Sequence, residues 1–244
     1  MGSVAELLES VKSGKKILNG LEFPMLDAPL EHTSYTSDLA AWRATSGVHT
    51  CPLKSEYPKG DMRWGLAGSA NTFTFMHIDS DGYNTFVKVL CGKKLWAFYR
   101  EGPSSSVSKI DVFTNPDFCL DNVLPQSEYG IEAIVLNPGD LLYVHSISSS
   151  DFYIMLTPVL SRFMKASTPH FVYGIEPCIM HGGHFYMMDL MQETVQSLLH
   201  SFVLNGFITN NTHYSSRSLL RRMLMFCYMG LIENVIHSSG ASTS

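Results

Sequence analysis

The chain has 244 residues, a length that suits one large β domain with a helical appendage or two small domains. Its hydrophobic fraction of 45% is typical of a globular protein, and its net charge of −5 argues against a general surface for binding polyanions. Its five cysteines are scattered and form no C-x-x-C pair, which argues against a disulfide framework or a zinc ribbon and favours a reduced intracellular protein.

The first part of the chain, residues 1–60, is predicted to be a helix and an irregular segment that pack on the core. Residues 3–18 carry apolar side chains near helical spacing. Residues 19–60 are rich in Pro, Asp and Ser, with a short helix predicted from 37 to 43 and capped by Ser37 or Asp38. The beginning of the chain lacks the apolar core of a signal peptide, and the longest apolar run is about half of a membrane span. We therefore expect no membrane association and an intracellular location, nuclear or cytoplasmic.

Residues 61–186 have the sequence pattern of a β domain. Short strands are predicted between turn residues, at 71–79, 84–90, 94–99, 132–136, 141–143, 171–173 and 184–186. Residues 91–93 are predicted to form a tight hairpin between the second and third of these strands. Many short strands separated by turns indicate a sandwich or a jelly roll, so the predicted class is mainly β with helical additions.

After residue 186 the sequence pattern changes from strand-like to helical. Residues 187–237 are predicted to form helices, including one at 218–236, that serve in packing or in forming a homodimer. Residues 238–244 are a polar tail that we expect to be disordered.

The strongest chemical signal is His77 and Asp79, which flank Ile78 and project from the same face of a strand. An imidazole and a carboxylate, joined by a distant second His, form the triad that holds Fe(II) and leaves coordination positions open. The preferred third ligand is His170, which follows a Pro turn and enters a strand. In a jelly roll we expect the two ligand strands to face each other across the barrel.

Two other histidines compete for the third position: His181 and His184. His184 is also a candidate for lining the pocket and donating a hydrogen bond to a ligand or cofactor. The simpler alternative for each of these histidines is a satisfied imidazole in a β-sheet.

Thr74 and Lys94 add context to the triad. Lys94 lies on an otherwise apolar strand, where a cation needs a buried counter-charge or an edge position. A buried lysine together with a hydroxyl group would anchor the distal carboxylate of 2-oxoglutarate. The alternative is an edge lysine that reaches solvent, although Lys93 is the better candidate for that position.

Residues 77–96 resemble a JmjC domain, particularly the small fungal type. Later landmarks follow in order: Asn137-Pro138-Gly139-Asp140-Leu141-Leu142, Thr168-Pro169-His170 and Gly182-Gly183-His184-Phe185-Tyr186. The resemblance covers roughly residues 65–186. It implies a double-stranded β-helix, a cupin-like jelly roll, with Fe(II) on His77, Asp79 and His170 and 2-oxoglutarate on Lys94 and Thr74. It also implies a dioxygenase that decarboxylates 2-oxoglutarate to succinate and hydroxylates a C–H bond, or demethylates an N-methyl group, without catalytic residues beyond the metal centre.

Residues 143–162 depart from this resemblance. Without them, Gly139-Asp140-Leu141-Leu142 would run directly into the segment before His170, as the family pattern requires. One hypothesis is that the segment is a translated intron, and the alternative is a genuine loop, such as a substrate lid.

Three functions are compatible with these residues. The first is an Fe(II)- and 2-oxoglutarate-dependent oxygenase that acts on a protein side chain, a nucleic acid base or a small molecule. The second is a non-catalytic jelly-roll interaction module, either because residues 143–162 impair the site or because the substrate cleft has been repurposed. The third is a cupin-type metal enzyme that does not use 2-oxoglutarate.

Overall fold

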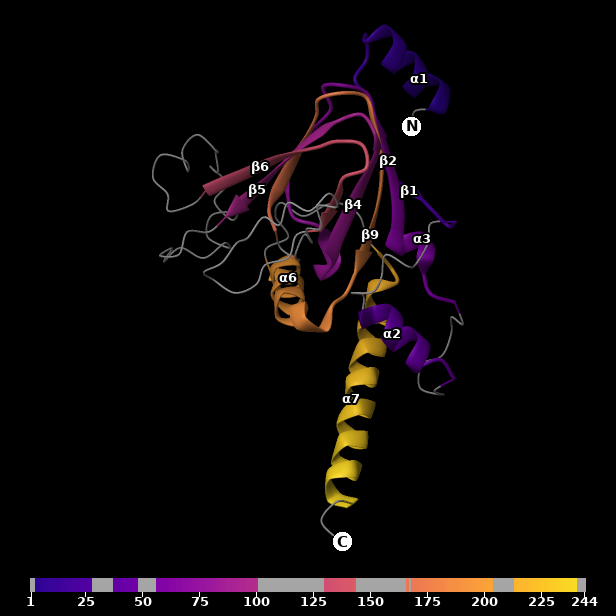
Figure 1. Ribbon diagram of the computed structural model, residues 1–244, viewed down its shortest axis with the longest axis vertical. Helices are drawn as coiled ribbons and strands as arrows, with labels where there is room; N and C mark the ends of the chain where they lie inside the picture. The colour runs from indigo at the N-terminus through magenta and orange to yellow at the C-terminus, as the bar shows by residue number, and fades with distance from the viewer. Residues whose placement is uncertain are drawn as a thin grey trace.

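The computed structural model describes residues 3–27, 37–47, 56–100, 130–143, 166, 168–203 and 213–240. Two antiparallel sheets form its centre (Figure 1). The five-stranded sheet has the order β1 (Asn19–Pro24), β2 (Arg63–Gly68), β9 (Cys178–Phe185), β4 (Asn84–Cys91) and β7 (Leu141–Tyr143). The four-stranded sheet has the order β3 (Phe73–His77), β8 (His170–Gly174), β5 (Lys94–Arg100) and β6 (Gly130–Leu136).

The connections between the sheets define a jelly roll. The chain passes from β2 in the first sheet to β3 in the second, returns to β4, and crosses again to β5 and β6. It then returns through β7, crosses to β8 and ends in β9, which lies between β2 and β4. Two packed antiparallel sheets linked in this way are the double Greek key of the jelly roll. The predicted fold class, mainly β with helical additions, is therefore confirmed.

The link between β4 and β5 differs from the predicted hairpin. The two strands are joined by Gly92 and Lys93 but do not pair, because β4 pairs with β7 and β9 while β5 pairs with β6 and β8. Gly92 has a φ of +76°, and a Cβ atom there would lie 1.9 Å from the carbonyl oxygen of Pro177. This close turn carries the chain from one sheet to the other, so the hairpin prediction is wrong.

The main core lies between the two sheets. Its buried side chains come from both layers: Trp64, Val87, Val89, Trp96, Phe98, Leu136, Leu142, Val172, Cys178 and Met180. Each of β4 and β5 presents one apolar face, and the faces meet across the sandwich instead of lying side by side. Burying both faces in one core is what favours the crossing at Gly92 over a hairpin.

The N-terminal segment contains helices and one strand in addition to irregular chain. Helix α1 (Val4–Ser13) begins with a capping box between Ser3 and Glu6 and ends at Gly14, so it is shorter than predicted. Strand β1 lies in the segment predicted to be irregular and pairs with β2 at the edge of the five-stranded sheet. Helix α2 (Ser37–Ala44) is present as predicted, and a short helix α3 (Lys59–Met62) precedes β2.

The described parts of the C-terminal segment contain helices, as predicted for residues 187–237. A 3-10 turn, η3 (Met188–Leu190), leads into α6 (Met191–Val203), and α7 (Ser216–Gly240) follows. Helix α7 extends away from the sandwich, with α2 against its first half (Figure 1). Residues 238–240 of the predicted disordered tail are helical, and residues 241–244 lie outside the described residues.

Two further observations bear on the predictions. No helix in the described part of the chain has the length and hydropathy needed to span a membrane. Apart from Tyr143, which ends β7, residues 143–162 lie outside the described residues, and so does the question of an intron or a lid.

Candidate metal centre

The predicted ligands His77, Asp79 and His170 lie together. His77 and His170 are register partners on the neighbouring antiparallel strands β3 and β8. The ligand strands therefore pair within one sheet, and the expectation that they face each other across the barrel is wrong. Asp79 follows β3 after the buried Ile78, and one ligand atom from each of the three residues lies within 4.8 Å of the others.

Hydrogen bonds to the backbone orient both histidines. His77 Nδ1 lies 2.7 Å from the carbonyl oxygen of Phe75, and His170 Nδ1 lies 2.9 Å from that of Thr168. Because a carbonyl oxygen only accepts, each Nδ1 must carry the proton and donate it. Each Nε2 then keeps its lone pair, which is the tautomer that a metal ligand requires.

Asp79 supplies the anionic donor. Its Oδ2 accepts a hydrogen bond of 2.8 Å from the Thr85 hydroxyl, while Oδ1 lies 3.8 Å from His77 Nε2. Burial raises the pKa of Asp79, but the nearby histidines and the Thr85 hydrogen bond outweigh it and lower the pKa overall. Burial and the neighbouring His77 lower the pKa of His170 to about 4. At neutral pH the site thus offers a carboxylate and a neutral His170, a donor set that can hold a divalent metal ion.

The predicted 2-oxoglutarate anchors lie on the same sheet. Thr74 on β3 and Trp96 on β5 both pair with Val172 of β8, so the three residues form a row across the sheet. Lys94 precedes Trp96 by two residues and is only 2% exposed. It lies on a strand flanked by β6 and β8, which excludes the alternative of an edge lysine.

Lys94 is buried without an acidic partner among the residues that the structure describes. Burial lowers its pKa, and it forms no ion pair with any residue that the structure describes. Its neighbour Lys93 instead pairs with Glu176 at 2.7 Å, with both side chains substantially exposed. The predicted contrast between Lys93 and Lys94 is therefore present.

His184 reaches the triad through Thr85. Its Nδ1 lies 3.0 Å from the Thr85 hydroxyl, and its ring is 4% exposed. The single hydroxyl proton of Thr85 goes to Asp79, so His184 must be the donor to Thr85. His184 thus contacts a residue that holds Asp79, while a contact with a cofactor stays a prediction. His181, the other rival, lies half-buried on β9 and belongs to neither cluster of converging ligand atoms.

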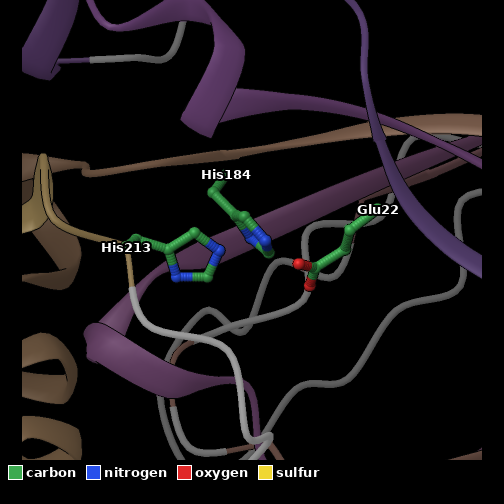
Figure 2. Close-up of side chains that lie close together, drawn as sticks. All are labelled: Glu22, His184 and His213. Carbon is green, nitrogen blue, oxygen red and sulfur yellow. The ribbon is translucent and has the colours of Figure 1, made fainter.

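A second cluster of ligand atoms was missed by the sequence reasoning. Glu22, His184 and His213 each offer a ligand atom within 4.8 Å of the other two (Figure 2). They come from β1, from β9 and from the turn before α7. The sequence carries no local signal for Glu22, which lies between the apolar residues Leu21 and Phe23 in a segment predicted to be irregular.

No protein-family model matches the chain, and no curated protein matches it. Among solved structures, it is similar to the conserved SPY1581 protein of unknown function from Streptococcus pyogenes, with a TM-score of 0.26 and 12% identity over 51% of this chain and 64% of that one. It is also similar to the Drosophila melanogaster CENP-C cupin domain, with a TM-score of 0.30 and 8% identity over 55% of this chain and 72% of that one. A second structure of that domain gives the same TM-score and identity over 53% and 62% of the two chains. The chain thus spans less than two thirds of the SPY1581 protein and of this second structure. The assignment of the jelly roll rests on the strand order of this chain.

Proposed function

We propose that the protein is an Fe(II)- and 2-oxoglutarate-dependent oxygenase of the JmjC type. The observation that carries the proposal is the convergence of one ligand atom from each of two imidazoles and one carboxylate, with both Nδ1 atoms bonded to backbone carbonyls. Two histidines and one carboxylate leave coordination positions open for a co-substrate. The order of His77, Asp79 and His170 along the chain is also that of the family it resembles.

Lys94 is proposed to bind the distal carboxylate of 2-oxoglutarate, with the Thr74 hydroxyl on the same sheet as a second contact. A buried ammonium group without an ion-pair partner favours an anion, and a carboxylate would relieve its desolvation. Lys94 lies four residues from Phe98, the register partner of His170, which is about 13 Å along the strand. The lysine side chain and a five-carbon diacid together suit this separation.

Aromatic side chains enclose the metal side of the site. The Trp96 ring stacks on His170 with a centroid distance of 5.4 Å and an angle of 12°, and Phe98 lies on the same face of β5. The indole N–H of Trp96 is buried and has no hydrogen-bond partner in the described structure, so it is available to a bound acid. These rings fix His170 and exclude water from one side of the metal.

With Fe(II), 2-oxoglutarate and O₂ bound, the cofactors would supply the oxidising chemistry, converting 2-oxoglutarate to succinate and CO₂ as a C–H bond is hydroxylated. The residues of the chain hold this assembly in place. His77 and His170 present fixed lone pairs, Asp79 contributes the negative charge, and Thr85 fixes the carboxylate by donating to Oδ2.

The direct test is succinate formation from 2-oxoglutarate by the full chain with Fe(II), O₂ and ascorbate, followed by mass spectrometry. Binding of 2-oxoglutarate is measured separately by calorimetry with Mn²⁺ in place of iron. We expect His170→Ala to lose both succinate formation and metal-dependent 2-oxoglutarate binding. Lys94→Met should lose 2-oxoglutarate binding, and Lys93→Met should resemble the wild type. Metal binding by His77, Asp79 and His170 without 2-oxoglutarate binding would instead favour a cupin-type metal enzyme. If the protein bound neither the metal ion nor 2-oxoglutarate, a non-catalytic jelly-roll module would be favoured instead.

A further inference from the structure

The cluster of Glu22, His184 and His213 has the hydrogen bonding of a metal site. The His213 Nδ1 lies 2.9 Å from Asp81 Oδ2, a carboxylate oxygen that accepts a hydrogen bond from the ring. The His184 Nδ1 donates to Thr85, as argued above. In the neutral form of each ring the Nε2 atom therefore carries the lone pair that a metal would bind, and in Figure 2 both rings and the Glu22 carboxylate converge.

The backbone of β1 turns Glu22 toward these histidines. Glu22 has a φ of +55°, and the register of β1 against β2 shifts between Gly20 and Phe23. A left-handed non-glycine residue at a bulge is uncommon and re-aims a side chain. As a result Glu22 is half-buried while its apolar neighbours Leu21 and Phe23 are 50% and 48% exposed, the reverse of the usual arrangement.

The carboxylate of Glu22 has no hydrogen bond or ion pair with any residue that the structure describes. A half-buried anion in this position needs a positive partner. The two imidazoles beside it offer lone pairs to the same space. A bound cation would satisfy all three groups together.

We propose that Glu22, His184 and His213 form a second metal site that binds Zn²⁺. Zinc is bound by imidazole nitrogen and carboxylate oxygen at about 2.0–2.2 Å in tetrahedral geometry, which places neighbouring ligand atoms about 3.4 Å apart. The ligand atoms here need to close only modestly from their present separations of up to 4.8 Å. The Asp81–His213 pair supplies the carboxylate–histidine–zinc arrangement that orients a zinc-bound ring. With three protein ligands, the fourth position is left to water or to a small anion.

The site is distinct from the proposed iron centre but touches it. The Thr85 hydroxyl bonds to Asp79 on one side and to His184 on the other. The three zinc ligands come from β1, β9 and the turn before α7, so the ion would join the N-terminal edge strand and the C-terminal helix to the sandwich. An edge strand can also carry an inward charge merely to prevent aggregation, and the test must separate that role from metal binding.

Metal stoichiometry separates the two sites. The full-length chain is stripped of metal, dialysed against Zn²⁺ and analysed by plasma mass spectrometry, with Zn²⁺ affinity measured by competition with a chromogenic chelator. We expect two zinc ions per wild-type chain, one in His170→Ala, and clearly less than one in the double variant His170→Ala, Glu22→Gln. Because His170→Ala disables only the first centre, loss of the proposed oxygenase activity leaves the zinc count of the second site unaffected.

Glu22→Gln tests the site without a folding ambiguity, because the substitution keeps the size of a partly exposed side chain. In the His170→Ala background, we expect at least a tenfold weaker Zn²⁺ affinity for Glu22→Gln and an unchanged affinity for the exposed control Glu9→Gln. Zn²⁺ should also raise the melting temperature of His170→Ala but not that of the double variant. Equal zinc affinity in His170→Ala with and without Glu22→Gln would overturn the proposal. Glu22 would then serve only as a charge that prevents aggregation at the edge strand.

Discussion

The Thr85 hydroxyl donates a hydrogen bond of 2.8 Å to Asp79 Oδ2 and accepts one from His184, so one buried side chain joins the two clusters of ligand atoms. This geometry fixes the carboxylate of one cluster and the tautomer of the other at the same time. A change at Thr85 should therefore affect both.

Thr85→Val keeps the shape of the side chain and removes the hydroxyl. We expect metal affinity to fall by roughly 10- to 100-fold at the His77, Asp79 and His170 site, and zinc affinity to fall at the Glu22, His184 and His213 site. The free energy of unfolding of the metal-free protein should fall by about 1.5–3 kcal/mol, because a partly buried carboxylate loses its hydrogen-bond donor. Metal titrations and urea unfolding measure both effects. Thr85→Ser retains the hydroxyl and should behave like the wild type; an equal loss in that control would contradict the hydrogen-bond argument.

Lys94→Met should separate stability from cofactor binding. Methionine fills a similar volume without the buried charge, so we expect the free energy of unfolding to rise by roughly 1 kcal/mol or more. Under the proposed function, 2-oxoglutarate binding should be lost while metal binding is retained. Denaturant melts and calorimetry with Mn²⁺ are the measurements. If Lys94→Met binds 2-oxoglutarate as tightly as the wild type does, Lys94 is not the anchor.

Asp38 should make stability depend on pH in an unusual direction. Burial raises the pKa of Asp38 to about 6, although the Tyr57 hydroxyl donates to its carboxylate. The folded state therefore favours the protonated acid, and the stability that this provides is complete below pH 3.8 and is lost as the pH rises through 6. We expect Asp38→Asn to gain roughly 3 kcal/mol on the wild type between pH 4 and pH 7.

The measurement for Asp38 is urea unfolding of both proteins at a series of pH values. The exposed Asp27→Asn is the matched control and should follow the wild type throughout. A difference between Asp38→Asn and the wild type that stays constant from pH 4 to pH 7 would show that the carboxyl does not titrate as described.

Gly92 and Gly139 allow conformational strain to be separated from steric overlap. Both have positive φ angles, +76° and +91°, but a Cβ atom at Gly139 would meet nothing within 4 Å. Gly139→Ala should cost only the left-handed backbone penalty of about 1–2 kcal/mol. Gly92→Ala should cost roughly 3 kcal/mol or more, because its Cβ would collide with the backbone of Pro177. Thermal unfolding compares the two, and similar losses would contradict the close crossing at Gly92.

The sequence reasoning located His77, Asp79 and His170 because each lies at a strand or turn with a readable local pattern. It placed the two ligand strands across the barrel, although β3 and β8 are neighbours. Alternation along a strand shows which face is buried but not which strand lies beside it. The same limit explains the link at Gly92, where two predicted strands joined by residues 91–93 suggest a hairpin but belong to different sheets.

The Glu22, His184 and His213 cluster could not be read from the sequence for a different reason. Its members are brought together by the pairing of β1 with β2 and by the turn before α7, both of which are tertiary features. Glu22 also lies in a segment whose Pro and Asp content indicates irregular chain. Only the bulge and the positive φ of Glu22 turn its carboxylate toward the histidines.

Glu22 and His213 stand near opposite ends of the described chain yet face each other (Figure 2). A pulling force applied between the two ends of the described chain would reach this junction on the edge strand β1 before it reached strands β2 to β9. With an ion held there, the load would pass directly from β1 to α7, and strands β2 to β9 would be shielded from it. The mechanical strength of the molecule would then depend on the concentration of free metal, and a chelator would turn a rigid domain into one that opens from its ends.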